Sequence, residues 1–184
     1  MTFSFLEYAF MQRALIAGLF VALSCSLIGV FLVLRRLSLI GDGLAHIAFG
    51  GLAVGLFTGT PPILTALVAT VGGALGIQYL KNNKVAADAA IAVIFSIGLA
   101  LGVVLVSLSR GFNVDLFTFL FGSILSVSQN DLYGVVGLGI VVLLSIIIFY
   151  KELLYITFDE ESAKASGLPI NFLNSLLMVI TAIT

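Results

Sequence analysis

Long apolar runs alternate with short polar breaks along this chain of 184 residues. An apolar run of about 20 residues can cross the roughly 30 Å hydrocarbon core of a bilayer as an α-helix. The runs long enough to do so are residues 14–34, 37–58, 63–80, 86–109 and 132–150. The pattern therefore predicts an all-α protein, a polytopic transmembrane helix bundle.

Both ends of the chain depart from this regular pattern. Residues 1–12 mix aromatic side chains with Glu7, which predicts a short interfacial helix. The run 14–34 is longer than the apolar region of a signal peptide, so we interpret it as a retained span. Residues 172–184 are apolar and end without a polar flank. We therefore expect residues 1–184 to be a single transmembrane domain that belongs to a longer chain.

The apolar run at residues 114–128 is too short for a full span and suits a half-depth helix. The positive-inside rule, by which Lys and Arg collect in cytoplasmic loops, bears on this choice. If the N-terminus is outside and residues 114–128 do not cross, six basic residues fall in cytoplasmic loops, namely Arg35, Arg36, Lys81, Lys84, Lys151 and Lys164. We therefore expect a short half-helix on the outer side.

The longest polar stretch, residues 151–169, contains the pattern of a short cytoplasmic helix. Acidic residues crowd the first turn of that helix, namely Asp159, Glu160 and Glu161. Gly167 can cap its end, and Pro169 prevents the helix from continuing. Such a helix between two spans is either a solvated loop or a docking site for a cytosolic partner.

The composition supports a membrane protein and excludes several other classes. Hydrophobic residues make up 61% of the chain and charged residues 9%, against about a quarter charged in soluble domains. A net charge of −1 gives no electrostatic basis for binding nucleic acid. The single cysteine excludes an internal disulfide and a structural zinc cluster. The sequence has no phosphate-binding loop, so any ATP-driven motor would be another polypeptide.

Asp42 and His46, the only histidine, interrupt the apolar run 37–58. Four residues apart on a helix, they share one face. Ionisable groups at membrane depth are costly and usually face a bundle interior or a wet pathway. A carboxylate oxygen and an imidazole nitrogen suit zinc, manganese or ferrous iron. The pair is therefore either part of a cation site completed by other groups, or a helix-end Asp beside a hydrogen-bonded buried His.

Three other aspartates, Asp88, Asp115 and Asp131, lie near predicted membrane boundaries. Solvated helix ends or N-terminal caps are the favoured interpretation of each. Asp115, on the outer half-helix, is also a candidate for the mouth of a pathway. The dipeptide Gly122-Ser123 resembles the nucleophile region of an intramembrane serine protease, but nothing places His46 beside it, so we interpret this serine as structural.

Glycines recur at four-residue spacing within the predicted spans. Small residues at this spacing let helices approach closely in membranes. The pairs are Gly51/Gly55, Gly72/Gly76 and Gly98/Gly102.

The residues around the ionisable pair resemble the signature of a known family. The stretch reads Arg35-Arg36-Leu-Ser-Leu-Ile-Gly41-Asp42-x-Leu44-Ala45-His46-x-Ala48-x-Gly50. It is similar to the ABC-3 family, the membrane permeases of bacterial zinc, manganese and iron importers. Weaker matches follow in the family's order, at Ala90 to Gly102, at Leu120 to Leu125 and at Phe158 to Gly167.

This resemblance implies a homodimeric permease that works with two cytosolic ATPase subunits and an extracytoplasmic metal-binding protein. It implies that Asp42 and His46 line the translocation pathway for a divalent ion, with no permanently bound cofactor and no enzymatic activity of the permease itself. It also implies a coupling helix within the cytoplasmic loop 151–170, formed around Asp159, Glu160, Glu161, Ala163 and Gly167. The expected location is the bacterial cytoplasmic membrane.

Two other functions are compatible with parts of the sequence. An ion-gradient-driven carrier or channel could use the carboxylate and the histidine to relay protons. An intramembrane hydrolase could use the serine at position 123. Among metals, the residue types suit zinc, manganese and iron alike.

Overall fold

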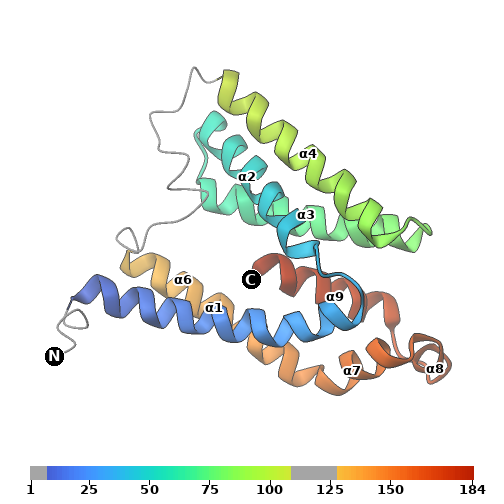
Figure 1. The fold of residues 1–184 in the computed structure, drawn as a ribbon. Coiled ribbons are helices and arrows are strands. Elements are labelled where there is room, and N and C mark those ends of the chain that lie inside the picture. Colours follow the sequence, from blue (N-terminus) through green and yellow to red (C-terminus); the bar gives the residue numbers. More distant parts are fainter. Residues whose placement is uncertain (1–7, 109–127) are drawn as a thin grey trace.

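The computed structural model describes residues 8–108 and 128–184, and all regular structure in these two ranges is helical (Figure 1). Five helices are long and apolar enough to cross a membrane, namely α1 (Ala9–Leu34), α2 (Ile40–Thr58), α3 (Pro62–Asn82), α4 (Ala87–Leu108) and α6 (Gln129–Ile148). Three shorter helices complete the described part, namely α7 (Tyr150–Phe158), α8 (Glu160–Ala165) and α9 (Ile170–Ile183). The predicted all-α transmembrane bundle is confirmed.

Some predicted boundaries are wrong. Helix α1 is continuous from Ala9, so residues 9–12 do not belong to a separate interfacial helix. No Gly or Pro separates them from the apolar run, and Arg13 interrupts the hydrophobic pattern without interrupting the helix. The polar stretch 151–169 holds two helices rather than one, because α7 precedes α8 and buries Leu153 and Ile156.

Helices α2, α3 and α4 form a glycine-packed group in which backbones touch. A Cβ atom at Gly50 would lie 2.6 Å from the carbonyl oxygen of Gly98, and one at Gly98 would lie 2.7 Å from the Cα of Ile47. On the other side of α2, a Cβ at Gly51 would lie 2.7 Å from the Cα of Ala66. Only glycine permits such approach, so α2 is held between its two neighbours.

The three predicted glycine pairs fare differently. The pairs that begin at Gly51 and Gly98 lie at helix contacts, as predicted. The pair Gly72/Gly76 is less closely packed, because among the described residues nothing comes within 4 Å of a Cβ at Gly72, and a Cβ at Gly76 would make only an ordinary contact with Ile94, at 3.4 Å. Four-residue spacing marks one face of a helix but does not say which face a partner covers.

Helices α1, α6, α7, α8 and α9 form a second, side-chain-packed group. Its core consists of large apolar residues from α1, α6, α7 and α9, among them Ile28, Phe31, Ile146, Leu153 and Leu177. Helix α9 joins this group to the other one, because Leu177 belongs to this core while the adjacent Met178 is buried among residues of α2, α3 and α4.

Helix contacts give the direction of each span. Phe20 packs against Gly139, and the rings of Phe31 and Tyr150 lie 6.2 Å apart, so α1 and α6 run parallel. Helices α2 and α4 also run parallel, since early residues of α2 meet early residues of α4 and later ones meet later ones.

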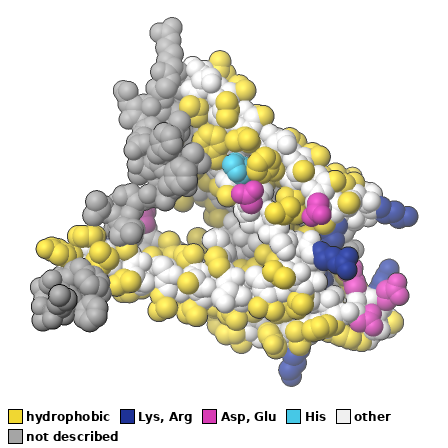
Figure 2. Space-filling model, in the orientation of Figure 1, with side chains coloured by type: hydrophobic (Ala, Val, Ile, Leu, Met, Phe, Trp, Pro, Cys, Tyr) yellow, Lys and Arg dark blue, Asp and Glu magenta, His cyan; other side chains and the backbone are white. Residues whose placement is uncertain are grey.

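These directions agree with the predicted topology. If α1 runs inward and α2 returns, α4 ends on the side where α6 begins, so residues 108 and 128 lie on the same side. Residues 114–127 of the predicted half-helix lie outside the described residues, as do Asp115, Gly122 and Ser123. Figure 2 shows Lys and Arg side chains mainly on the side of the molecule where α3 ends and where α7 and α8 lie, as expected for the cytoplasmic side.

Candidate functional site

The ionisable pair lies in the first two turns of α2. The helix begins after the fully buried Leu37, and its first residue, Ile40, is also fully buried. Burial of Leu37 and Ile40 fixes the rotation of α2 about its own axis, which places Asp42 and His46 on one face of the helix. Asp42 stands in the first turn, where the positive end of the helix dipole favours a carboxylate.

The two side chains are close but not hydrogen-bonded to each other. His46 Nε2 lies 3.9 Å from Asp42 Oδ1, beyond hydrogen-bond distance. The Asp42 side chain is 71% exposed and that of His46 is 33% exposed. The imidazole also packs against the ring of Phe95 on α4, with ring centres 4.3 Å apart and planes inclined at 64°. The imidazole of His46 is therefore packed against Phe95 on one side, whereas the carboxylate of Asp42 is open to solvent.

The pair is accessible on an otherwise apolar face. Figure 2 shows the only histidine (cyan) with an acidic side chain beside it, open to view among hydrophobic side chains. An ionisable pair does not face lipid without a large penalty, so this face is expected to meet water or protein. Within residues 8–108 and 128–184, no cluster of three or more His, Cys, Asp or Glu side chains could hold a metal ion. The pair alone supplies two donor groups, so other groups must complete any site.

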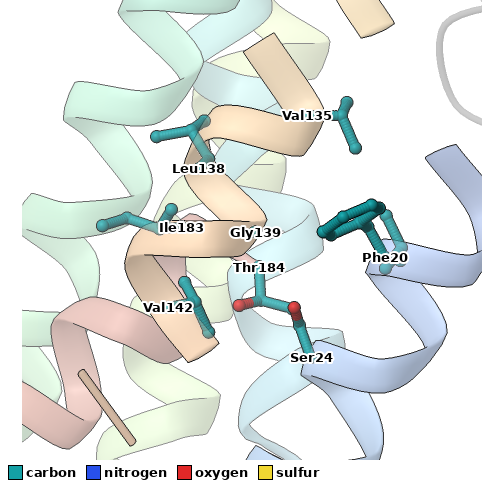
Figure 3. Close-up of a pocket in the computed structure, with 9 residues that line it drawn as sticks. Phe20, Ser24, Val135, Leu138, Gly139, Val142, Ile183 and Thr184 are labelled. Atoms are coloured by element: carbon teal, nitrogen blue, oxygen red, sulfur yellow. The ribbon is translucent and has the colours of Figure 1, made fainter. Parts of the chain in front are cut away.

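Two cavities lie elsewhere in the bundle and are mostly apolar. The larger, about 640 Å³, runs between α1, α2 and α3 beside the end of α9, and neither Asp42 nor His46 lines it. The smaller, about 80 Å³, lies between α1 and α6. Its lining includes Phe20 and Ser24 from α1 and Val135, Leu138 and Val142 from α6 (Figure 3). Neither cavity offers a charged group to a cation.

Two of the three predicted helix-end aspartates, Asp88 and Asp131, lie in first turns of helices, and the third, Asp115, lies outside the described residues. Ser128 caps α6, and its backbone N–H donates to Asp131 Oδ2 at 3.1 Å while the Asp131 N–H donates to Ser128 Oγ at 3.2 Å. Asp88 is exposed in the first turn of α4. Asp131 lies on α6, in the side-chain-packed group, whereas Asp88 lies in the first turn of α4, whose early residues pack against the early residues of α2.

Helix α8 begins with a side-chain cap that the sequence analysis did not predict, because Asp159 precedes the first turn as its cap residue and does not lie within it. The Ser162 N–H donates to Asp159 Oδ1 at 2.9 Å, and the hydrogen bonds from Ser162 hold the pKa of that carboxyl below its ordinary value. Glu160 and Glu161 follow in the first turn and are exposed. The acidic end of this helix is therefore charged and open to solvent.

The other end of α8 closes in a Schellman motif. Gly167, with φ of 81°, lies one residue beyond the cap residue, and its N–H donates to the Lys164 carbonyl at 3.1 Å. The Leu168 N–H donates to the carbonyl of Ala163, whose side chain is fully buried. The prediction of a left-handed glycine here is confirmed, and Ala163 anchors α8 to the side-chain-packed group.

Sequence reasoning missed one polar cluster. The guanidinium of Arg35 donates from Nη1 to Asn174 Oδ1 at 2.6 Å and from Nη2 to the carbonyl of Ile156 at 3.3 Å. Burial lowers the pKa of Arg35, and the negative charge of Glu160 acts in the opposite direction. Arg35 entered the sequence argument only as a loop charge. An asparagine inside the apolar run 172–184 was the available signal, because a buried amide needs a partner.

Comparison with known proteins decides the family. The ABC 3 transport family matches residues 7–184 of the chain. This chain belongs to the ABC-3 family. The match includes α2 with its ionisable pair and the segment from α7 to α9.

Named members of the ABC-3 family are similar along nearly the whole chain. The manganese transport system membrane protein MntC of Halalkalibacterium halodurans is 39% identical over 97% of this chain and 61% of its own length. The manganese import system permease protein ScaB of Streptococcus gordonii is 37% identical over 95% of this chain and 63% of its own. This chain therefore spans about three fifths of the length of these relatives.

A solved structure in the family has the same fold. The structure described as PsaBC from Streptococcus pneumoniae in complex with Fab matches with a TM-score of 0.77 and 37% sequence identity. The match covers 97% of this chain and 66% of that one. Together with the five apolar helices, this similarity identifies the ABC-3 chain as a multi-pass membrane protein.

Proposed function

We propose that this chain is the membrane permease of an ATP-driven importer that carries manganese or a similar divalent metal ion across the bacterial cytoplasmic membrane. The observation that carries the proposal is the partly exposed Asp42–His46 pair on an apolar face of α2. The names of the related proteins, which refer to manganese transport, support the choice of metal.

The chemistry of the pair fits an ion in transit. A carboxylate and an imidazole both bind manganese, iron and zinc, while two donors alone bind weakly. Weak binding suits a pathway, because an ion that binds too tightly does not leave. The exposure of Asp42 lets a cation approach before it has lost all of its water. Asp115 is proposed for the mouth of the same pathway.

The partners follow from the same proposal. A second copy of the permease would complete the metal site, and an extracytoplasmic binding protein would deliver the ion. Residues 151–170 would form the coupling loop, with the exposed Glu160 and Glu161 of α8 turned to a cytosolic ATPase subunit and the buried Ala163 holding the helix in place. The loop lies on the side where the basic residues gather, which supports a cytosolic contact.

Dependence on ATP separates this function from the gradient-driven alternative. The sequence has no phosphate-binding loop, and membership of the ABC-3 family favours a separate ATPase subunit. Uptake of Mn²⁺ into proteoliposomes that contain the full-length protein, its ATPase and its binding protein should require ATP. Uptake driven by a proton gradient without ATP would favour the carrier instead.

The decisive variant is Asp42→Asn/His46→Gln. It keeps size and hydrogen bonding but removes the charge and the imidazole, so Mn²⁺ uptake should be lost while expression and dimerisation are retained. Asp88→Asn, which changes an exposed carboxylate in the first turn of α4, is the matched control and should transport normally. Near-normal uptake by the double variant would reduce the pair to a structural role.

A further inference from the structure

Arg35 stands at the junction of three segments that are distant in sequence. It follows α1 directly, and its side chain reaches the carbonyl of Ile156 on α7 and the amide oxygen of Asn174 on α9. Asn174 is only 4% exposed, so this contact is an interior one. Few polar side chains are buried in the described part of the chain, which makes a bonded arginine and asparagine at this point a specific arrangement.

The turn that links Arg35 to α2 is hydrogen-bonded and partly buried, so we expect it to move as a unit. Arg36 takes a left-handed conformation, with φ of 58°, and the Leu37 N–H donates back to the carbonyl of Leu32 at 2.8 Å. Leu37 and Ile40 are fully buried on either side of the turn into α2. This tight and partly buried turn favours transmission of a displacement of Arg35 to the first turn of α2, which holds Asp42.

The opposite end of the cluster belongs to the segment proposed to meet the ATPase. Ile156 lies in the last turn of α7, and Asp159, which caps α8, follows three residues later. Glu160, in the first turn of α8, attracts Arg35 electrostatically. Any shift of α8 on binding a partner would therefore act on the acceptors of Arg35 before it acts on the rest of the bundle.

We propose that Arg35 is a positioning residue that links movement of α7 and α8 to the start of α2, and thereby links ATP hydrolysis to opening of the metal pathway. This inference rests on the proposed role of α8 as the docking helix. The planar fork of arginine can hold two acceptors at once, which the single ammonium of a lysine cannot do in the same geometry.

The test measures Mn²⁺ transported per ATP hydrolysed, in proteoliposomes with the full-length protein, its ATPase and its binding protein. Arg35→Gln should lower this ratio by about tenfold, a usual size for coupling between sites, while ATP hydrolysis continues. Asn174→Leu removes one acceptor and keeps the side-chain size, so it should lower the ratio in the same way. Arg36→Gln is the matched control, because the side chain of Arg36 is exposed and the change replaces one side chain by another at the same left-handed backbone position. It should keep the normal ratio.

The outcomes are distinguishable. A normal ratio in both Arg35→Gln and Asn174→Leu overturns the inference, as does an equal loss in Arg36→Gln. If Arg35→Gln fails to insert in the membrane, Asn174→Leu decides alone, with Asn174→Asp expected to retain coupling because it still accepts from Arg35. Failure of the proposed function would appear instead as normal uptake in the Asp42→Asn/His46→Gln variant, which leaves the Arg35 cluster intact.

Discussion

The two helix groups of this molecule are packed by different means. In the glycine-packed group, backbones of α2, α3 and α4 touch, with distances below 3 Å from a Cβ that glycine omits. In the side-chain-packed group, large aliphatic and aromatic residues fill the space between α1, α6, α7 and α9. The proposed metal pair lies in the first group and the proposed docking helix in the second.

The difference indicates how the helices of each group can respond when one of them is displaced. Backbone contact leaves no adjustable atoms between helices, so α2, α3 and α4 should move together. Side chains can change rotamer, so α7 and α8 can adjust against α1 and α9 without losing their core. A rigid unit with the proposed ion site, joined to an adaptable unit with the proposed docking helix, is a suitable division of roles for a transporter.

The largest effect is expected when a single methyl group is added to the glycine-packed group. Gly98→Ala places a Cβ about 2.7 Å from the Cα of Ile47, where backbone has to move. Overpacking of this kind costs about 1–3 kcal/mol, and it would shift the helix that carries His46, so Mn²⁺ uptake should be abolished. Thermal unfolding in detergent and uptake assays measure the two effects.

Gly72→Ala is the control for that variant, since nothing among the described residues comes within 4 Å of its Cβ. Alanine favours a helix over glycine by about 1 kcal/mol, so this change should be neutral or stabilising. Equal effects of the two substitutions would mean that backbone contact is not what distinguishes the group.

The side-chain-packed group should show a smaller effect at its docking helix. Gly167→Val forces a β-branched residue into a left-handed conformation and distorts the turn that ends α8. The protein should insert normally, but binding of the ATPase should weaken several-fold or hydrolysis should lose its link to uptake. Ala165→Val, exposed in the same helix, should bind the ATPase normally. Unchanged transport by the glycine variant would argue against docking through α8.

Sequence patterns predicted one kind of feature in both groups and missed another. The long helices, the Asp42–His46 spacing and the Gly167 turn follow from periodicity and capping, which are local properties. The contact of Arg35 with Asn174 joins residues 139 positions apart, and no local pattern carries that information. Of the three glycine pairs, periodicity could not tell the two at close backbone contacts from the less closely packed one, because it identifies a face of a helix but not the neighbour of that face.

The contact between His46 and Phe95 offers a finer test within the glycine-packed group. Phe95→Leu keeps an apolar side chain but removes the ring that holds the imidazole. Such ring pairs are worth about 0.5–1.5 kcal/mol, so the Mn²⁺ concentration for half-maximal uptake should rise by roughly 2- to 10-fold. Ile97→Leu, on an exposed part of the same helix, should leave it unchanged. The same value for both variants would show that the ring does not orient the histidine.

The smallest expected effect concerns the turn between α3 and α4. Lys84 adopts a left-handed conformation with φ of 65°, which costs about 1 kcal/mol for a residue with a side chain. Lys84→Gly should therefore raise stability slightly, by less than about 1 kcal/mol, since glycine also gains freedom in the unfolded chain. Asn83→Gly should lower the stability, because Asn83 has a negative φ, of −89°, that suits a residue with a side chain. A lower melting temperature for Lys84→Gly would contradict this account.

The 3.9 Å gap between His46 and Asp42 bears on which cations the proposed pathway would pass quickly. Side chains that bond to each other must separate before either can coordinate an ion, and that separation adds to the activation barrier. Here the two side chains are not hydrogen-bonded to each other, so at the proposed site the barrier to entry would come mainly from the water that the arriving ion must shed. Magnesium loses its water reluctantly. The gap would thus favour manganese over the far more abundant magnesium by rate of exchange, even where the two bind with similar strength.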